Sequence, residues 1–170
     1  MPNCTEIVDA KAAFHGIPDI EVTSSLPSWI SLRIAPKLHL KRSVVDFFRL
    51  RMSDLSTEVC DELCLAIDEL LGNAIEHGCK LGPKSRCELT FIRMSRMILV
   101  QLRDSGFGFE WNAINHAAVN NPPEDPLRHL QLRLEREMRP GGYGIMLVKQ
   151  VADELMYNER GNQVVFVKYL

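Results

Sequence analysis

Three polar side chains, Glu69, Asn73 and His77, follow one another at intervals of four residues. On a helix this spacing places them in a single stripe. The carbonyl oxygen of Asn suits Mg²⁺, which prefers oxygen ligands, and a Glu one turn away can accept a proton from an attacking hydroxyl group or water. The stripe suits ATP chemistry, and on its own it fits a solvated helix face at least as well, since Glu and Asn are common there. His77 fits a phosphate contact and a structural helix-end residue equally well.

A glycine-rich segment, Asp104-Ser105-Gly106-Phe107-Gly108-Phe109, directly follows a predicted strand. Gly106 and Gly108 permit backbone conformations and close approaches that other residues do not. Asp104, at the end of the strand, can accept a hydrogen bond from an exocyclic amine such as that of adenine. Taken alone, the segment also fits an ordinary glycine-rich turn with an Asp cap.

A second glycine-rich segment, Gly141-Gly142-Tyr143-Gly144, opens a predicted helix. The free N–H groups and the dipole of a helix N-terminus favour phosphate, and Arg139 just before it adds a positive charge. A flexible hinge is the alternative interpretation, and a lid over a ligand needs hinges. Neither a Walker sequence nor the strand–helix unit of a dinucleotide site is present, and no Cys/His set has zinc spacing.

The elements that must position these residues are predicted from hydrophobic periodicity. Helices are expected over 38–52, from 56 or 57 to about 77, from Asp125-Pro126 onward and over about 145–153, and strands over 29–34, 86–94, 96–103, 154–159 and 163–169. This order predicts an α+β fold, a two-layer sandwich of one mixed, largely antiparallel sheet with helices on one face. Residues 1–28 are interpreted as an irregular or short-stranded N-terminal extension, and residues 29–170 as one domain.

The composition argues against several classes of protein. The chain has 170 residues, 46% of them hydrophobic and 25% charged, with a net charge of −2, which gives no electrostatic reason to expect nucleic-acid binding. No apolar run reaches the length of a membrane span and no secretory signal is visible, so a cytoplasmic location is expected. The five cysteines do not suggest a disulfide framework. Cys60 and Cys64 share a helix face, either as buried core residues or as metal ligands.

Four separated stretches together resemble the GHKL ATPase superfamily, whose members share the Bergerat ATP-binding fold. They are AIDELLGNAIEHG at 66–78, LRDSGFGF at 102–109, RPGGYGIMLVKQVADELMY at 139–157 and the tail GNQVVFVKYL. The first three are similar to the N, G1 and G2 boxes of that superfamily. The similarity covers about 29–170 and is greatest to its small stand-alone branch, the anti-sigma-factor serine/threonine kinases.

The resemblance implies a role for each candidate residue, with ATP and Mg²⁺ as cofactors. Glu69 would be the catalytic base and Asn73 the Mg²⁺ ligand, while Asp104 would bind the adenine amine. The remaining nucleotide-binding residues would be His77, Gly106, Gly108, Arg139, Gly141, Gly142, Tyr143 and Gly144. Residues 110–140 would form the ATP lid, and Asp153 would fix a helix–strand junction.

The resemblance also implies partners. Kinases of this branch phosphorylate a serine of a small anti-sigma-factor antagonist, many sequester a sigma factor, and they usually form homodimers. Glu76 stands where many histidine kinases have a basic residue, which favours the anti-sigma-factor type. The alternative is a nucleotide-gated binding protein that sequesters a sigma factor or other regulator with little phosphotransfer. Its docking surface would be the apolar face of the lid helix, which can equally pack on its own domain: Leu127, Leu130, Leu134 and Met138. ATP hydrolysis that drives a conformational cycle is a third possibility.

Overall fold

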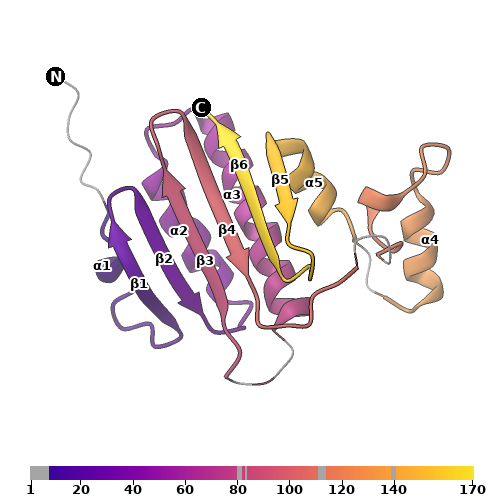
Figure 1. Cartoon of the computed structure of the whole chain (residues 1–170), viewed down its shortest axis with the longest axis horizontal. Coiled ribbons are helices and arrows are strands. Elements are labelled where there is room, and N and C mark those ends of the chain that lie inside the picture. The colour runs from indigo at the N-terminus through magenta and orange to yellow at the C-terminus, as the bar shows by residue number, and fades with distance from the viewer. Residues whose placement is uncertain (1–7, 80–81, 83, 111–113, 139–140) are drawn as a thin grey trace.

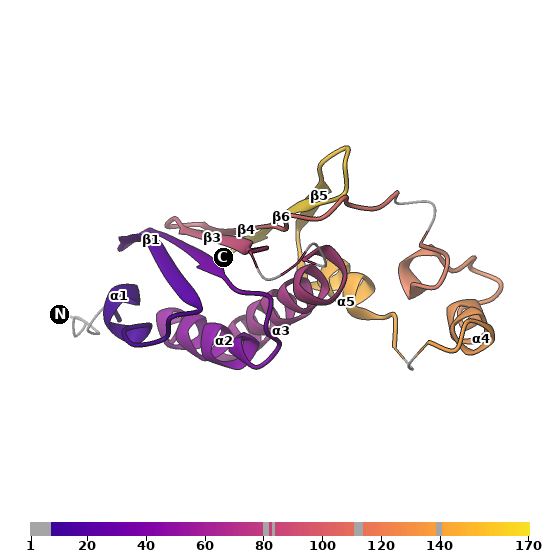
Figure 2. The same ribbon diagram turned by 90° about the horizontal axis from the view of Figure 1, so that it is seen from below.

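The computed structural model describes residues 8–79, 82, 84–110, 114–138 and 141–170. One six-stranded sheet has the order β1-β2-β3-β4-β6-β5 (Figure 1). Its strands are β1 (Ile20–Leu26), β2 (Trp29–Ile34), β3 (Cys87–Arg93), β4 (Met97–Arg103), β5 (Glu154–Tyr157) and β6 (Gln163–Tyr169). Four helices pack beneath it (Figure 2): α1 (Ala10–Ala13), α2 (Leu40–Arg51), α3 (Thr57–Asn73) and α5 (Gly144–Val151). The predicted α+β two-layer sandwich is confirmed.

The sheet differs from the prediction in one respect, because all five strand pairs are antiparallel rather than mixed. Short reversals join β1 to β2, β3 to β4 and β5 to β6, and such hairpins give antiparallel pairs. Between β2 and β3 the chain runs down α2 and back along α3, so β3 starts at the end where β2 stopped. The connection from β4 through the predicted lid and α5 brings β5 back in the direction of β4, but β6 lies between these two strands and pairs with both in the antiparallel sense. None of the described pairs is therefore parallel.

Helix α3 carries most of the predicted site and forms as its sequence indicates. Ser56 caps its first turn by accepting the N–H of Val59 at 3.3 Å. Its buried side contains Cys60, Leu63, Cys64, Ile67 and Leu71, a row that shares one core with Phe91 and Phe166 of the sheet and Phe48 of α2. The helix continues as one π-helical turn, η1 (Ala74–Gly78), closed by the N–H of Cys79 on the carbonyl of Ala74. The predicted end near His77 is thus confirmed.

The segment interpreted as an N-terminal extension joins the same fold in its described part. Asp9 caps α1, and β1 pairs with β2 along its length, with a bulge between Val22 and Ser24. Strand β1 is therefore an edge strand of the sheet that carries the site.

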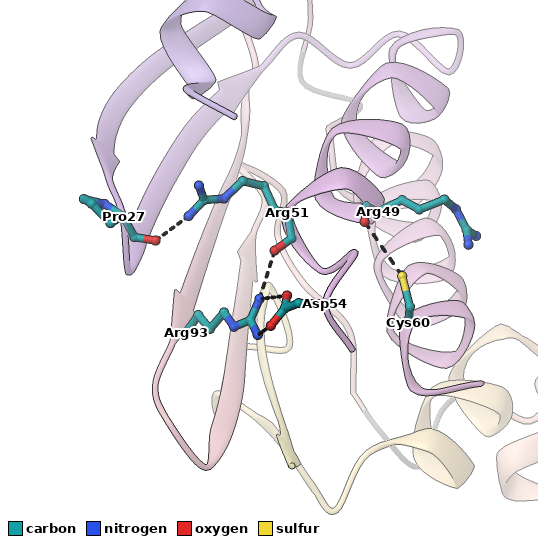
Figure 3. A network of polar contacts seen from close by, with 6 residues as sticks. All are labelled: Pro27, Arg49, Arg51, Asp54, Cys60 and Arg93. Carbon is teal, nitrogen blue, oxygen red and sulfur yellow. Dashed lines mark hydrogen bonds and ion pairs between the residues drawn. The ribbon is translucent and has the colours of Figure 1, made fainter. Parts of the chain in front are cut away.

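A polar network links this N-terminal hairpin to the helices (Figure 3). Arg93 donates two hydrogen bonds to the carboxylate of Asp54, at 2.7 and 2.5 Å, and one to the carbonyl of Arg51 at 3.0 Å. The side chain of Arg51 donates in turn to the carbonyl of Pro27, in the turn between β1 and β2. The network therefore holds the β1–β2 turn, the end of α2 and the α2–α3 turn together.

The described part of the segment predicted to be a lid, called the lid below, lies beyond the end of the sandwich, where α4 (Arg128–Glu135) packs with the 3-10 turn η3 (Ala118–Asn120) (Figure 2). The expected helix start at Asp125-Pro126 is wrong, because α4 begins at Arg128 without a side-chain cap from its own segment. Asn121 supplies the contacts instead: its Oδ1 accepts the N–H of His129 at 2.9 Å, and its Nδ2 donates to the carbonyl of Pro126. A residue outside the helix thus takes the role of the cap.

The structure bears on the alternative left open for Cys60 and Cys64. Cys60 and Cys64 are both buried in the core, and within the described ranges no group of three or more His, Cys, Asp or Glu side chains is arranged to hold a metal ion. The same part of the chain contains no helix that combines the length and the apolar character of a membrane span.

Candidate functional site

A cavity of about 300 Å³ lies at the end of the sandwich that adjoins the lid. That volume is at the lower end of the range for small-molecule sites. Its walls come from the end of α3 with η1, the end of β4, the β5–β6 hairpin, the lid and the start of α5. The apolar part of the lining consists of Leu70, Ala74, Leu102, Phe109, Ile114, Ala117, Ile145, Tyr157 and Val164. Such a surface suits a flat organic group such as a base.

Asp104 is a polar group in this apolar part of the cavity. Its Oδ1 accepts the N–H of Gly106 at 2.8 Å, and a Cβ at Gly78 would overlap its carboxyl group. Partial burial raises the pKa of Asp104, while the hydrogen bond from Gly106 and the charge of Arg160 oppose that shift. A carboxylate with little access to water is a strong acceptor for a ligand amine.

The position of Asp104 depends on Asn162, a buried residue that the sequence analysis did not select. The backbone N–H of Asp104 donates to the carbonyl of Asn162 at 3.0 Å. The Asn162 side chain donates to the carbonyls of Asp104 and Gly106, at 3.2 and 3.5 Å, and accepts from Asn158 at 2.9 Å. The hairpin between β5 and β6 therefore fixes the end of β4. In the sequence, Asn162 has only the appearance of a turn residue.

The predicted stripe on α3 is divided between the cavity and its rim. Asn73 and His77 line the cavity, and Glu69 does not. Glu69 lies one turn earlier, against the start of α5, where a Cβ on Gly144 would overlap its Oε2 and lie 3.7 Å from Asn73 Nδ2. The structure thus brings the carboxylate, the amide and the glycine segment together. A π-helical turn such as η1, directly after Asn73, is frequent at functional sites.

The glycine residues predicted to bind nucleotide differ in position. Gly108, Gly142 and Gly144 line the cavity, whereas Gly106 and Gly141 do not. Gly106 packs against the carbonyl of Gly78 so closely that a Cβ there would overlap it, which places Gly106 behind Asp104.

Of the predicted residues next to these glycines, Tyr143 does not contribute to the lining and Arg139 cannot be placed. Tyr143 packs edge-on against His129, with ring centroids 4.6 Å apart, and is not among the cavity residues. Arg139 lies outside the described residues.

The lid supplies Arg133 and His116, which the sequence analysis also missed. Both line the cavity, and Arg133 donates from Nη1 to the carbonyl of His116 at 3.3 Å. The same nitrogen lies 3.3 Å from the position of a Cβ on Gly142. Burial first, and then the charges of Arg133, Arg136 and His77, lower the pKa of His116. A group whose protonation is opposed by nearby cations indicates a positive potential, which suits phosphate. Nothing in the lid sequence distinguishes Arg133 from its neighbouring arginines.

The oxygen donors fit a magnesium nucleotide. The amide oxygen of Asn73 and the carboxylate of Glu69 are hard oxygen groups on one helix, next to glycines whose backbone can approach phosphates closely. The Asn73 oxygen alone does not complete an octahedral shell, so phosphate oxygens and water would have to supply the remaining ligands. That division is usual for Mg²⁺ bound with a nucleotide.

Fold and cavity together define a two-layer α+β domain of the nucleotide-binding ATPase class. The chain belongs to the family described as histidine kinase-like ATPase domain, whose pattern it matches over residues 34–168. That range contains α3, the Asp104 loop and the glycine segment, and it supports ATP as the ligand. Among curated proteins no match to this chain was found.

Proposed function

We propose that this protein is an ATP-binding serine/threonine protein kinase of the anti-sigma-factor type, which phosphorylates a small anti-sigma-factor antagonist in a partner-switching pathway. The observation that carries the proposal is the position of Glu69, held against Gly144 beside Asn73 at the rim of the cavity. A carboxylate at the rim, rather than deep in the cavity, is accessible to a hydroxyl group presented by another protein.

The geometry supports a distribution of roles. Asp104 accepts a hydrogen bond from the adenine amine, and Gly142 and Gly144 allow the phosphates to approach the start of α5. Asn73 would hold Mg²⁺, which neutralises charge on the phosphates. At the rim, Glu69 takes the proton of the acceptor serine while the serine hydroxyl oxygen forms a bond to the terminal phosphorus of ATP. The bond from that phosphorus to the bridging oxygen breaks, and ADP leaves.

The kinase proposal is tested with the full chain, MgATP and the candidate antagonist encoded nearest to its gene. We expect phosphoserine on the antagonist, and a loss of about 10²–10⁴-fold in rate for Glu69→Gln with ATP affinity retained. Asn73→Ala should instead lose the Mg²⁺-dependent part of ATP binding. Glu58→Gln, at an exposed position in the first turn of the same helix, is the matched control. ATP binding without any phosphate transfer to protein would refute the kinase proposal and leave the ATP site intact.

A second candidate function is a nucleotide-gated protein that sequesters a sigma factor or other regulator. It is favoured by the exposed leucines at the lid helix: Leu127, directly before α4, and Leu134, within it, are 59% and 79% exposed. Such apolar exposure next to a nucleotide site can couple partner capture to ATP. Capture of purified sigma factor that depends on ATP, is unchanged in Glu69→Gln and is lost in Leu134→Glu would favour this function.

The proposed pathway carries two further expectations. A partner of the transcription machinery requires a cytoplasmic location, and the expected homodimer would bind one nucleotide per chain. Light scattering of the purified protein with and without MgATP measures the number of chains in the particle.

A further inference from the structure

The thiols of Cys79 and Cys87 form a buried pair behind the cavity. Their sulfur atoms lie 2.9 Å apart, and the two residues are 5% and 0% exposed. Cys79 ends the π-helical turn that follows Asn73, and Cys87 is the first residue of β3, opposite Ile34 of β2. Neither thiol has a part in the proposed phosphotransfer.

The pair is coupled to the loop that carries Asp104. The hydroxyl of Ser105 points to Cys79 Sγ at 3.9 Å, and Ser105 directly follows Asp104. Gly78, directly before Cys79, packs against the Asp104 carboxyl group and against Gly106. A change at the sulfur of Cys79 therefore acts on the Gly78–Cys79 turn and on the Asp104 loop. Both segments position Asp104, the proposed acceptor for the adenine amine.

The environment also distinguishes the two sulfurs. A hydrogen bond from Cys87, together with hydrogen bonds from Ser105, lowers the pKa of Cys79 against the opposing effect of burial. The same thiol–thiol hydrogen bond, and burial after it, raise the pKa of Cys87. A thiolate is the reactive form of cysteine, so Cys79 is the nucleophile of the pair and Cys87 its neighbouring resolving thiol.

We propose that Cys79 and Cys87 are a peroxide-sensitive thiol pair whose oxidation to a disulfide weakens nucleotide binding. The effect on nucleotide rests on the proposed ATP site, whereas the oxidation itself does not. Hydrogen peroxide is the oxidant. The sulfur of Cys79 attacks one peroxide oxygen and the O–O bond breaks. Cys79 becomes a sulfenic acid, and the other peroxide oxygen departs as water. Cys87 sulfur then attacks Cys79 sulfur, the S–O bond breaks, and a second water carries away the Cys87 proton. The two thiols lose two electrons in total, and the peroxide gains them.

The change in geometry is small and its effect is local. A disulfide bond is about 2.05 Å long, so the sulfurs approach each other by about 0.9 Å. Bond formation removes the thiolate that accepts hydrogen bonds from Ser105. Loss of hydrogen bonds to a charged acceptor typically changes an equilibrium constant by about tenfold or more, so we expect the Kd for ATP to rise about tenfold on oxidation.

The test uses the full chain with Cys4→Ser, Cys60→Ala and Cys64→Ala, which leaves only the pair. The protein is reduced, desalted and treated with hydrogen peroxide, and a non-reducing digest is analysed by mass spectrometry while ATP binding is titrated in parallel. We expect a peptide linked through Cys79 and Cys87, an increase of about tenfold in Kd, and recovery of both after dithiothreitol. Cys87→Ala should form no link and should be labelled at Cys79 by a sulfenic-acid reagent.

Two results would overturn the inference. Absence of the linked peptide at peroxide concentrations that oxidise free cysteine in solution would refute the oxidation, whatever the protein binds. A complete link with unchanged ATP affinity would refute the regulatory effect. Failure of the proposed function has a different signature, because the reduced protein would then fail to bind ATP at all. Thermal unfolding of Cys87→Ala and of the reduced protein establishes that both are folded.

Discussion

Replacement of Asp104 by Asn changes one atom of the proposed adenine contact and leaves the local fold in place. The Oδ1 of Asp104 accepts the N–H of Gly106 at 2.8 Å, and an Asn can accept the same hydrogen bond through its carbonyl oxygen. The second oxygen, which we assign to the adenine amine, becomes an NH₂ group. The NH₂ group of the variant then faces the adenine amine, and both are donors. The adenine therefore loses its hydrogen bond, while the N–H of Gly106 keeps its acceptor.

The expected magnitude follows from the kind of hydrogen bond. A hydrogen bond to a charged group contributes about 1.5–3 kcal/mol, which corresponds to an increase of about 10–150-fold in the Kd for ATP. Inosine triphosphate carries an oxygen where ATP carries the amine, so it accepts from the amide group of the variant and is repelled by the native carboxylate. Asp104→Asn should therefore reverse the preference between the two nucleotides.

Isothermal titration of both nucleotides with the native protein and with Asp104→Asn measures this reversal. Asp46→Asn, on the exposed side of α2, is the control for the change in net charge. Equal affinity of Asp104→Asn and the native protein for ATP would falsify the assignment of Asp104 to the adenine amine. A parallel loss for both nucleotides would show that the substitution acts through the loop and not through the base.

Three further predictions test the remaining walls of the site. Gly144→Ala should reduce kcat for phosphotransfer about tenfold or more, because the added methyl group overlaps Glu69 Oε2 and displaces this catalytic base. The midpoint of thermal unfolding should not fall, because Ala is a better helix former than Gly. Asn162→Ala should lower the free energy of unfolding by about 1–3 kcal/mol, measured by urea denaturation against the exposed control Glu159→Ala. Arg133→Ala should weaken ATP about tenfold or more but leave adenosine unaffected, whereas the lid control Arg128→Ala should change neither.

Asp104 also gives a dependence of stability on pH with a definite sign. Burial raises its folded pKa above the ordinary value of 3.8, so the folded protein binds this proton more tightly than the unfolded chain does. The resulting contribution to stability is fully present below pH 3.8 and is lost as the pH rises through the folded pKa. In Asp104→Asn that slope should be absent. Urea denaturation of both proteins without nucleotide, at a series of pH values from below 3.8 upward, measures the free energy of unfolding against pH. Identical slopes for the two proteins would contradict the buried state of the carboxyl group.

The central helices and strands could be predicted because their burial repeats regularly along the chain. The row from Cys60 to Leu71 on α3 and the alternation in β3 and β4 both follow the periods of helix and strand. The direction of the strands was harder, since the sequence does not state which strands become neighbours. The order of elements predicts a mixed, largely antiparallel sheet, whereas every described pair is antiparallel. The helices α2 and α3 return the chain so that β3 pairs antiparallel with β2, and β6 lies between the parallel-running β4 and β5.

The site could be predicted only where its residues lie in short motifs. Asn73, Asp104 and Gly144 stand beside recognisable neighbours, and the fold brings them to one cavity. Asn162 and Arg133 act through contacts with residues far along the chain, and no local pattern marks such residues. The lid helix was misplaced for the same reason, because its first turn is held by a side chain outside the helix.

The two edges of the sheet limit how copies of this protein can associate. An exposed strand edge offers free backbone N–H and C=O groups to a strand from another molecule, which is a common route to aggregation. Here one edge is β1, interrupted by the bulge between Val22 and Ser24, and the other is β5, only four residues long. A bulge bends and twists an edge, and a short strand offers few backbone groups. Addition of strands from molecule to molecule is therefore disfavoured, and the protein should resist growth into continuous intermolecular sheets when it is concentrated.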